Sequence, residues 1–80
     1  MRIDKYLKVS RIIKRRTLAQ EACDSGRVFV NGKMAKPSTE VKVGDIIEVH
    51  FGDRVFKCRV TSVDEKVQKN LASNMYEIIE

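Results

Sequence analysis

The stretch RVFVNGKMA at residues 27–35 decides the fold, because two short runs of β-prone residues flank an Asn31-Gly32 pair. Both residues tolerate the positive φ that a type I′ turn requires, so Asn-Gly between such runs is the strongest short-range signal for a β-hairpin. We therefore predict two antiparallel strands joined by a tight turn.

Further strands are expected on the C-terminal side of this hairpin. Residues 46–51 are rich in apolar side chains. The pairs Gly44-Asp45 and Gly52-Asp53, which are typical of turns, directly precede and follow them. Residues 55–60 alternate between apolar and polar side chains, as a half-buried partner strand does. After a polar segment at 64–74, residues 75–79 are predicted to form a last short strand.

Two helices are expected on the N-terminal side. Residues 2–9 place Ile3, Tyr6 and Leu7 on one apolar face. Residues 15–25 form the second helix, with Gly26 as its C-terminal stop. Its apolar face is predicted to consist of Leu18, Ala19, Ala22 and Cys23, and its N-terminus to carry a capping box made by Thr17 and Gln20.

These elements predict a single domain over residues 1–80, of the α+β class. Its two N-terminal helices pack on a small, mostly antiparallel sheet. A chain of 80 residues has a thin core and little room for a deep catalytic cavity.

Charge is distributed unevenly along the chain. Residues 1–36 contain ten Lys and Arg against three Asp and Glu, and the other 44 residues contain six against eight, so the two parts carry +7 and −2 and sum to +5. A clustered basic surface gains free energy by displacing counterions condensed on phosphates. The sequence therefore predicts a polyanionic partner, with nucleic acid the obvious choice.

A basic residue recurs at every third position near the N-terminus. On one straight α-helix such residues would wind around the axis and form no single face. A break is needed if they are to form one patch, and Ser10 is the predicted place for it. The five residues are Arg2, Lys5, Lys8, Arg11 and Lys14.

Arg15 and Arg16 are predicted at the first turn of the second helix, where the helix dipole disfavours cations. A phosphate bound at that helix N-terminus would explain their position. On the dipole alone, Arg16→Ala should leave the fold intact or slightly more stable. We expect Arg2 and Lys5 to be close to Asp4 only in sequence, so that most of the first seven basic residues are not offset by an acid.

The inventory of reactive side chains argues against an enzyme. His50, the one histidine, lies within a strand pattern, and Ser10 has no nearby histidine as its base. The aspartates are scattered singly at turns and caps, which suits local hydrogen bonds better than metal binding. Cys23 and Cys58 lie 35 positions apart and are predicted to be buried free thiols. We expect no catalytic residue, no metal and no cofactor.

Nothing in the chain indicates export or membrane insertion. The N-terminal residues are charged, without the apolar run of a signal peptide, and no stretch approaches the roughly 20 apolar residues of a transmembrane helix. We therefore expect a soluble, cytoplasmic protein that makes no membrane contact.

Several motifs resemble the RNA-binding domain named after small-subunit ribosomal protein S4. The resemblance spans residues 1–49 and is most specific at 26–33 and the following Gly44-Asp45. It implies that the two helices and the hairpin, known as the αL motif, form an RNA-binding surface, with a C-terminal hairpin and last strand at 50–80. Many members carry a small capping residue where Arg15 stands. The matching motifs are RIDKYL at 2–7, SR at 10–11, RTLA at 16–19, GRVFVNGK at 26–33, KPS at 36–38 and VGDIIEV at 43–49.

The domain occupies nearly the whole chain, whereas most relatives attach it to a catalytic or ribosomal body. With KRRTLA at 14–19 and NMYEI at 74–78, the chain is similar to stand-alone members that act in bacterial ribosome quality control and, less closely, to a small ribosome-associated heat-shock protein. This resemblance implies a non-enzymatic monomer that binds stalled large (50S) ribosomal subunits through rRNA and peptidyl-tRNA. It further implies a role in nascent-chain tailing or rescue, together with a tailing factor on the same subunit.

Two alternatives stay open at this point. A ribosomal or ribosome-assembly protein could use the same surface permanently, and an RNA-modifying enzyme is disfavoured because no catalytic domain accompanies the motifs. In each of these cases the basic residues of 1–36 make the contact with RNA. The residues predicted to bind RNA are Arg2, Lys5, Lys8, Arg11, Lys14, Arg15, Arg16, Arg27, Asn31 and Lys33.

Overall fold

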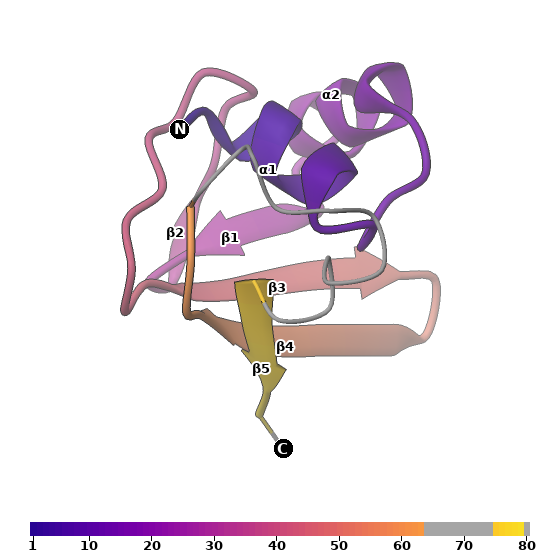
Figure 1. Ribbon diagram of the computed structural model, residues 1–80. Coiled ribbons are helices and arrows are strands. Elements are labelled where there is room, and N and C mark those ends of the chain that lie inside the picture. The colour runs from indigo at the N-terminus through magenta and orange to yellow at the C-terminus, as the bar shows by residue number, and fades with distance from the viewer. Residues whose placement is uncertain (64–74, 80) are drawn as a thin grey trace.

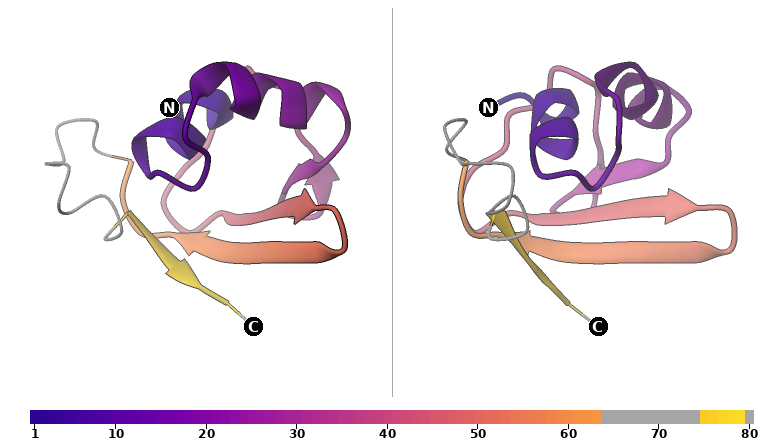
Figure 2. Two further views of the ribbon diagram at one scale, coloured as in Figure 1. Left: turned by 90° about the vertical axis from the view of Figure 1, so that its right-hand side faces the viewer. Right: turned by 45° about the vertical axis from the view of Figure 1, so that its right-hand side comes forward.

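Two helices lie on one face of a five-stranded antiparallel sheet in the computed structural model, which describes residues 1–63 and 75–79 (Figures 1 and 2). The strand order in the sheet is β2-β1-β3-β4-β5. The predicted α+β class is confirmed, while the polar segment predicted at 64–74 lies outside the described residues. The elements are α1 Ile3–Val9, α2 Arg16–Asp24, β1 Val28–Val30, β2 Lys33–Met34, β3 Ile46–Phe51, β4 Arg54–Val60 and β5 Tyr76–Ile78.

The predicted hairpin is present between β1 and β2. Asn31 and Gly32 have φ values of 53° and 81°, as the two central residues of a type I′ turn require. Val30 pairs with Lys33 directly across this turn. β1 also pairs with β3, which in turn pairs along its length with β4, so the hairpin is joined to the rest of the sheet.

The break between the two helices lies where the sequence predicts it. α1 ends at Val9 with Ser10 as its C-cap, and Arg11 follows in the left-handed region at φ 65°. The side chains of Ile3, Tyr6 and Leu7 are fully buried against the sheet. The left-handed residue redirects the chain, so that α2 packs beside α1 and does not continue it.

The start of α2 differs from the prediction in two respects. Its N-cap is Arg15, which makes no side-chain capping bond, so the capping box at Thr17 and Gln20 is wrong. Gln20 donates to Asp4 of α1 and is therefore turned toward the neighbouring helix. Leu18 is 46% exposed, because the contact face is centred on the small side chains Ala19, Ala22 and Cys23. Leu18 lies beside that face at the first turn.

The last strand is tied to the first helix through the core. Met75, which precedes β5, is fully buried, and its carbonyl oxygen accepts a 2.7 Å hydrogen bond from Tyr6 Oη. Burial raises the pKa of the Tyr6 hydroxyl, with smaller contributions from Cys58 and Tyr76. Tyr6 therefore remains a neutral hydrogen-bond donor over the physiological pH range.

The prediction of two buried free thiols is confirmed. Cys23 and Cys58 are buried and free, and burial raises the pKa of each thiol to about 11. Phe29 lies on the sheet face away from the helices, where its ring centroid is 5.1 Å from that of His50. None of the helices among the described residues has the length and apolar character needed to cross a membrane.

Candidate nucleic-acid interface

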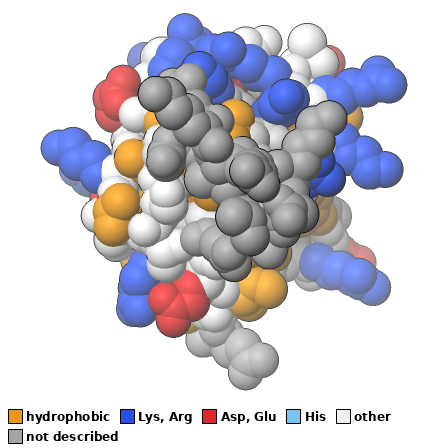
Figure 3. Space-filling model, viewed as in Figure 1, with side chains coloured by type: hydrophobic (Ala, Val, Ile, Leu, Met, Phe, Trp, Pro, Cys, Tyr) orange, Lys and Arg blue, Asp and Glu red, His pale blue; other side chains and the backbone are white. Residues whose placement is uncertain are grey.

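The predicted RNA-binding side chains are accessible. Nine of the ten belong to exposed residues, and Lys5 is partly buried. Lys and Arg side chains gather along the top of the molecule, above the two helices, and continue down one side (Figure 3). The surface that contains Arg2, Lys5, Lys8, Arg11, Lys14, Arg15 and Arg16 is called the helical basic surface below.

A buried carboxylate lies beneath this surface. Asp4 is fully buried, and its Oδ1 accepts a 2.7 Å hydrogen bond from the Lys5 amide, while its Oδ2 accepts a 3.0 Å bond from Gln20 Nε2. Two guanidinium groups also reach it. Arg2 Nη2 lies 3.2 Å from Oδ2, and Arg16 places Nε 3.3 Å from Oδ2 and Nη2 3.4 Å from Oδ1.

These contacts keep Asp4 ionised. Burial alone would raise the pKa of its carboxyl, because desolvation disfavours the charged form. The hydrogen bonds from Gln20, Arg16 and the Lys5 amide, together with the positive charge of Arg16, outweigh burial and lower the pKa below its ordinary value. Asp4 is therefore a fixed negative charge on which one arginine from the start of each helix converges.

This cluster corrects two expectations. Arg2 approaches Asp4 in space as well as in sequence, so that one carboxylate partly offsets both Arg2 and Arg16. The position of Arg16 against the helix dipole also has an explanation within the protein, since Asp4 supplies its counter-charge. Sequence reasoning missed this pair because Asp4 and Arg16 are 12 positions apart and belong to different helices.

The N-terminus of α2 is nevertheless suited to an anion. Arg15 provides no side-chain cap, and the first turn contains no acidic residue. Within residues 1–63 and 75–79, Arg15 forms no ion pair. By contrast, the first amides of α1 donate to the loop that follows β2, from Ile3 to Thr39 O and from Asp4 to Pro37 O. The phosphate predicted at the start of α2 stays a prediction.

The three hairpin residues are arranged differently. Arg27 precedes β1 and Asn31 follows it, so the two lie at opposite ends of that strand. Arg27 Nε donates to Ser25 Oγ at 2.8 Å. Asn31 is occupied internally, since its Nδ2 donates to Asp45 Oδ1 at 3.1 Å and its Oδ1 accepts from the Ile46 amide at 2.9 Å. The structure therefore brings Arg2 and Arg16 together on Asp4, whereas Arg27 lies at one end of β1 and Asn31 and Lys33 lie at the turn at its other end.

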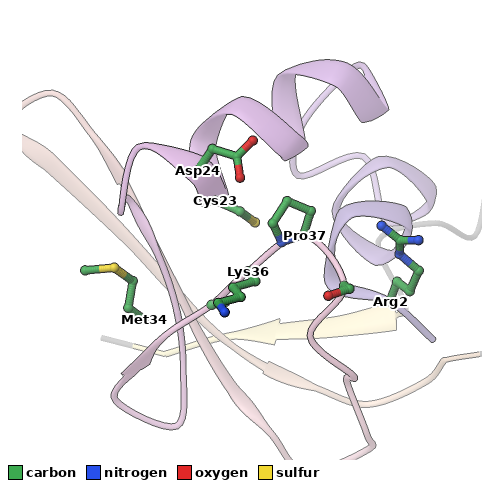
Figure 4. A pocket seen from close by; sticks show the side chains of 8 residues that line it. Arg2, Cys23, Asp24, Met34, Lys36 and Pro37 are labelled. Atoms are coloured by element: carbon green, nitrogen blue, oxygen red, sulfur yellow. The ribbon is translucent and has the colours of Figure 1, made fainter.

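A groove of about 650 Å³ adjoins Arg2 on the side of α2 (Figure 4). In this view Arg2 lies at one end and Met34 at the other, with Pro37 between them below α2. Lys36 contributes a second cation and Asp24 an acid. The sequence motif at 36–38 includes Lys36, but Lys36 was not predicted as a contact because no pattern places it beside Arg2.

The acids, cysteines and histidine of the described residues do not gather in one place. Among residues 1–63 and 75–79, no three His, Cys, Asp or Glu side chains come together as metal ligands would. His50 lies on the other face of the sheet, 3.6 Å from Glu48 Oε2. The helical basic surface carries two guanidinium groups oriented by Asp4, which suits phosphate recognition.

Comparisons with known proteins identify the family and similar chains. Residues 1–47 match the model of the S4 domain. Proteins named RQC P-site tRNA stabilizing factor from Streptococcus pneumoniae and Halalkalibacterium halodurans are each 53% identical, over 99% and 98% of this chain and 90% and 89% of their own length. The solved structure of Vibrio cholerae Heat Shock Protein 15 superposes with a TM-score of 0.88 at 29% identity, over 99% of this chain and 81% of that one.

Proposed function

We propose that this chain, which belongs to the S4 domain family, is an RNA-binding protein of ribosome quality control. The proposal follows the name of its relatives, RQC P-site tRNA stabilizing factor. It binds large (50S) ribosomal subunits that still hold peptidyl-tRNA, and it contacts both the rRNA and the tRNA. Its role is to hold that tRNA in place while the nascent chain is tailed or released. This would place it with ribosomes in the cytoplasm, as a monomeric binding factor with no catalytic step of its own.

The observation that carries the proposal is the pair of guanidinium groups on the helical basic surface. Arg2 and Arg16 are bound to one buried carboxylate, yet their side chains remain 47% and 43% exposed. A guanidinium carries five N–H donors in a fixed plane, so each arginine keeps donors for a phosphate after binding Asp4. Two such groups at fixed separation recognise a folded RNA by the layout of its phosphates.

Base stacking has a smaller part in this proposal. The ring of Phe29 packs against His50 on the sheet face away from the helices, so it lies off the helical basic surface. The contacts are therefore proposed to come from Lys and Arg to the RNA backbone. Lys5, Lys8, Arg11, Lys14 and Arg15 are proposed to extend the surface around the pair, and Arg27, Asn31 and Lys33, which lie outside it, are proposed as additional contacts.

Sedimentation of ribosomes tests this function. We expect the tagged protein to be substoichiometric and enriched on free large subunits that carry peptidyl-tRNA, with crosslinks to large-subunit rRNA and to tRNA. Release of the peptidyl-tRNA with puromycin should remove it from those fractions. A ribosomal protein would instead be present at one copy on every large subunit, and that distribution would refute the proposal.

The salt dependence of binding tests the contact itself. Each phosphate that is neutralised should contribute about 0.7–0.9 to the slope of log K against log salt concentration. Several contacts on the helical basic surface therefore predict a slope of several units. A slope near zero would exclude binding through the RNA backbone.

A further inference from the structure

An acid beneath an RNA-binding surface needs an explanation, because its charge repels phosphate. Asp4 lies under the helical basic surface and remains ionised there, since its pKa is lowered. A buried charge is costly unless it is paired and hydrogen-bonded. Asp4 meets this condition with five contacts from four residues, of which two are the arginines that carry the proposed function.

The contacts cross between the two helices. Arg2 is the N-cap of α1, whereas Arg16 and Gln20 lie on the first and second turns of α2. Asp4 thus restrains side chains from two helices, of which α2 otherwise buries only small residues. Long arginine side chains lose conformational freedom when they bind, and a side chain that is already oriented loses less.

We propose that Asp4 is a positioning residue for RNA binding, whose buried carboxylate orients Arg2 and Arg16 toward the same stretch of RNA backbone. This inference rests on the proposed function. The gain from orienting the two guanidinium groups exceeds the repulsion that Asp4 exerts on the RNA. Neutralising this acid therefore weakens binding, although it makes the protein more positively charged.

The sign of the effect separates this proposal from simple electrostatics. Asp4→Asn keeps the shape of the side chain and raises the net charge from +5 to +6. If only charge mattered, this variant would bind RNA more tightly. If Asp4 orients the arginines, it binds more weakly, by about tenfold for two side chains that must now be ordered on binding.

The matched control is Glu21→Gln. Glu21 lies on α2, is exposed, and its replacement makes the same change in net charge away from the cluster. The affinity of each variant is measured for purified large subunits carrying peptidyl-tRNA, at a temperature where circular dichroism shows all proteins folded. We expect Glu21→Gln to bind as tightly as the unmodified chain or slightly more tightly, and Asp4→Asn about tenfold more weakly.

A double-mutant cycle assigns the effect to the arginines. In a chain that already carries Arg2→Gln and Arg16→Gln, Asp4→Asn should cause no further loss of affinity. An undiminished loss in that background would mean that Asp4 supports the surface by another route, and it would overturn the proposal. So would an Asp4→Asn variant that binds as tightly as the unmodified chain.

A second variant covers the case in which Asp4→Asn does not fold. Gln20→Met removes a hydrogen bond to the carboxylate without changing the charge or much of the volume. It should weaken binding by a smaller factor, and unchanged affinity would refute the proposal. If the unmodified chain itself does not bind these subunits, the proposed function fails, which is distinct from binding that is insensitive to Asp4.

Discussion

Replacing Arg16 with alanine should lower both the stability of the fold and the affinity for large ribosomal subunits. Its two contacts with Asp4, at 3.3 and 3.4 Å, are longer than the roughly 2.7–2.9 Å of strong charge-assisted hydrogen bonds. The side chain is also 43% exposed, so that water screens the pair. We therefore place their contribution at the lower end for bonds to a charged group, about 1.5 kcal/mol.

The helix dipole opposes part of this loss. Removing a cation from the first turn of α2 stabilises the helix by about 0.3–1 kcal/mol. The net loss in the free energy of unfolding is therefore about 0.5–1 kcal/mol. For a domain of this size, that corresponds to a fall in Tm of about 2–8 °C. The dipole alone predicts the opposite sign, so thermal melting followed by circular dichroism distinguishes the two accounts.

Binding is measured on the same variants by co-sedimentation with large subunits that carry peptidyl-tRNA. Arg16→Lys keeps the charge but loses the planar fork, so its affinity should lie between those of the alanine variant and the unmodified chain. Arg59→Ala is the control, because Arg59 belongs to an exposed pair with Glu77 at 3.9 Å, on the sheet. A folded Arg16→Ala protein that co-sediments normally would remove Arg16 from the interface, and an unchanged or raised Tm would refute the stability argument.

Three further substitutions test the framework of the site. Tyr6→Phe should lower the free energy of unfolding by about 0.5–1.5 kcal/mol in urea titrations, because the Met75 carbonyl keeps two amide donors; a loss above about 3 kcal/mol would contradict this. Asn31→Gly retains the left-handed turn but loses both side-chain hydrogen bonds, and it should cost about 1–3 kcal/mol; an unchanged midpoint would show that these bonds contribute nothing. Because the pKa of Asp4 is lowered from 3.8, the stability advantage of the unmodified chain over Asp4→Asn should be complete above about pH 5 and shrink as the pH falls below 4; an advantage that grows with acid would reverse the assigned shift.

Much of the fold could be predicted because the deciding signals are local. The turn at Asn31-Gly32 depends on the backbone freedom of two adjacent residues, and the buried face of α1 depends on the spacing of Ile3, Tyr6 and Leu7. Each of these properties depends only on a short stretch of sequence. The same holds for the break after Ser10, which the basic pattern required.

The site was less predictable because its decisive contacts join distant residues. Thr17 and Gln20 have the spacing of a capping box, but Gln20 reaches across to Asp4, and that choice depends on how the helices pack. The exposure of Leu18 has the same origin, since the small residues of α2 set the line of closest approach. The many basic residues of 1–36 indicate a binding surface from composition alone. The contacts of Asp4 with Arg2 and Arg16 can be recognised only once the positions of the two helices are known.

The hydrogen bond from Tyr6 to Met75 also bears on how this surface could be transplanted. The S4 match ends at residue 47, and all the proposed RNA contacts lie within it. The buried cluster that supports α1, however, includes Cys58 and Val60 of β4 and Met75, which precedes β5. The segment that matches the S4 domain is therefore shorter than the segment whose side chains form the core. A chimaera that carries this surface onto another protein must include β4 and β5, because without them α1 would have lost part of the core on which it rests.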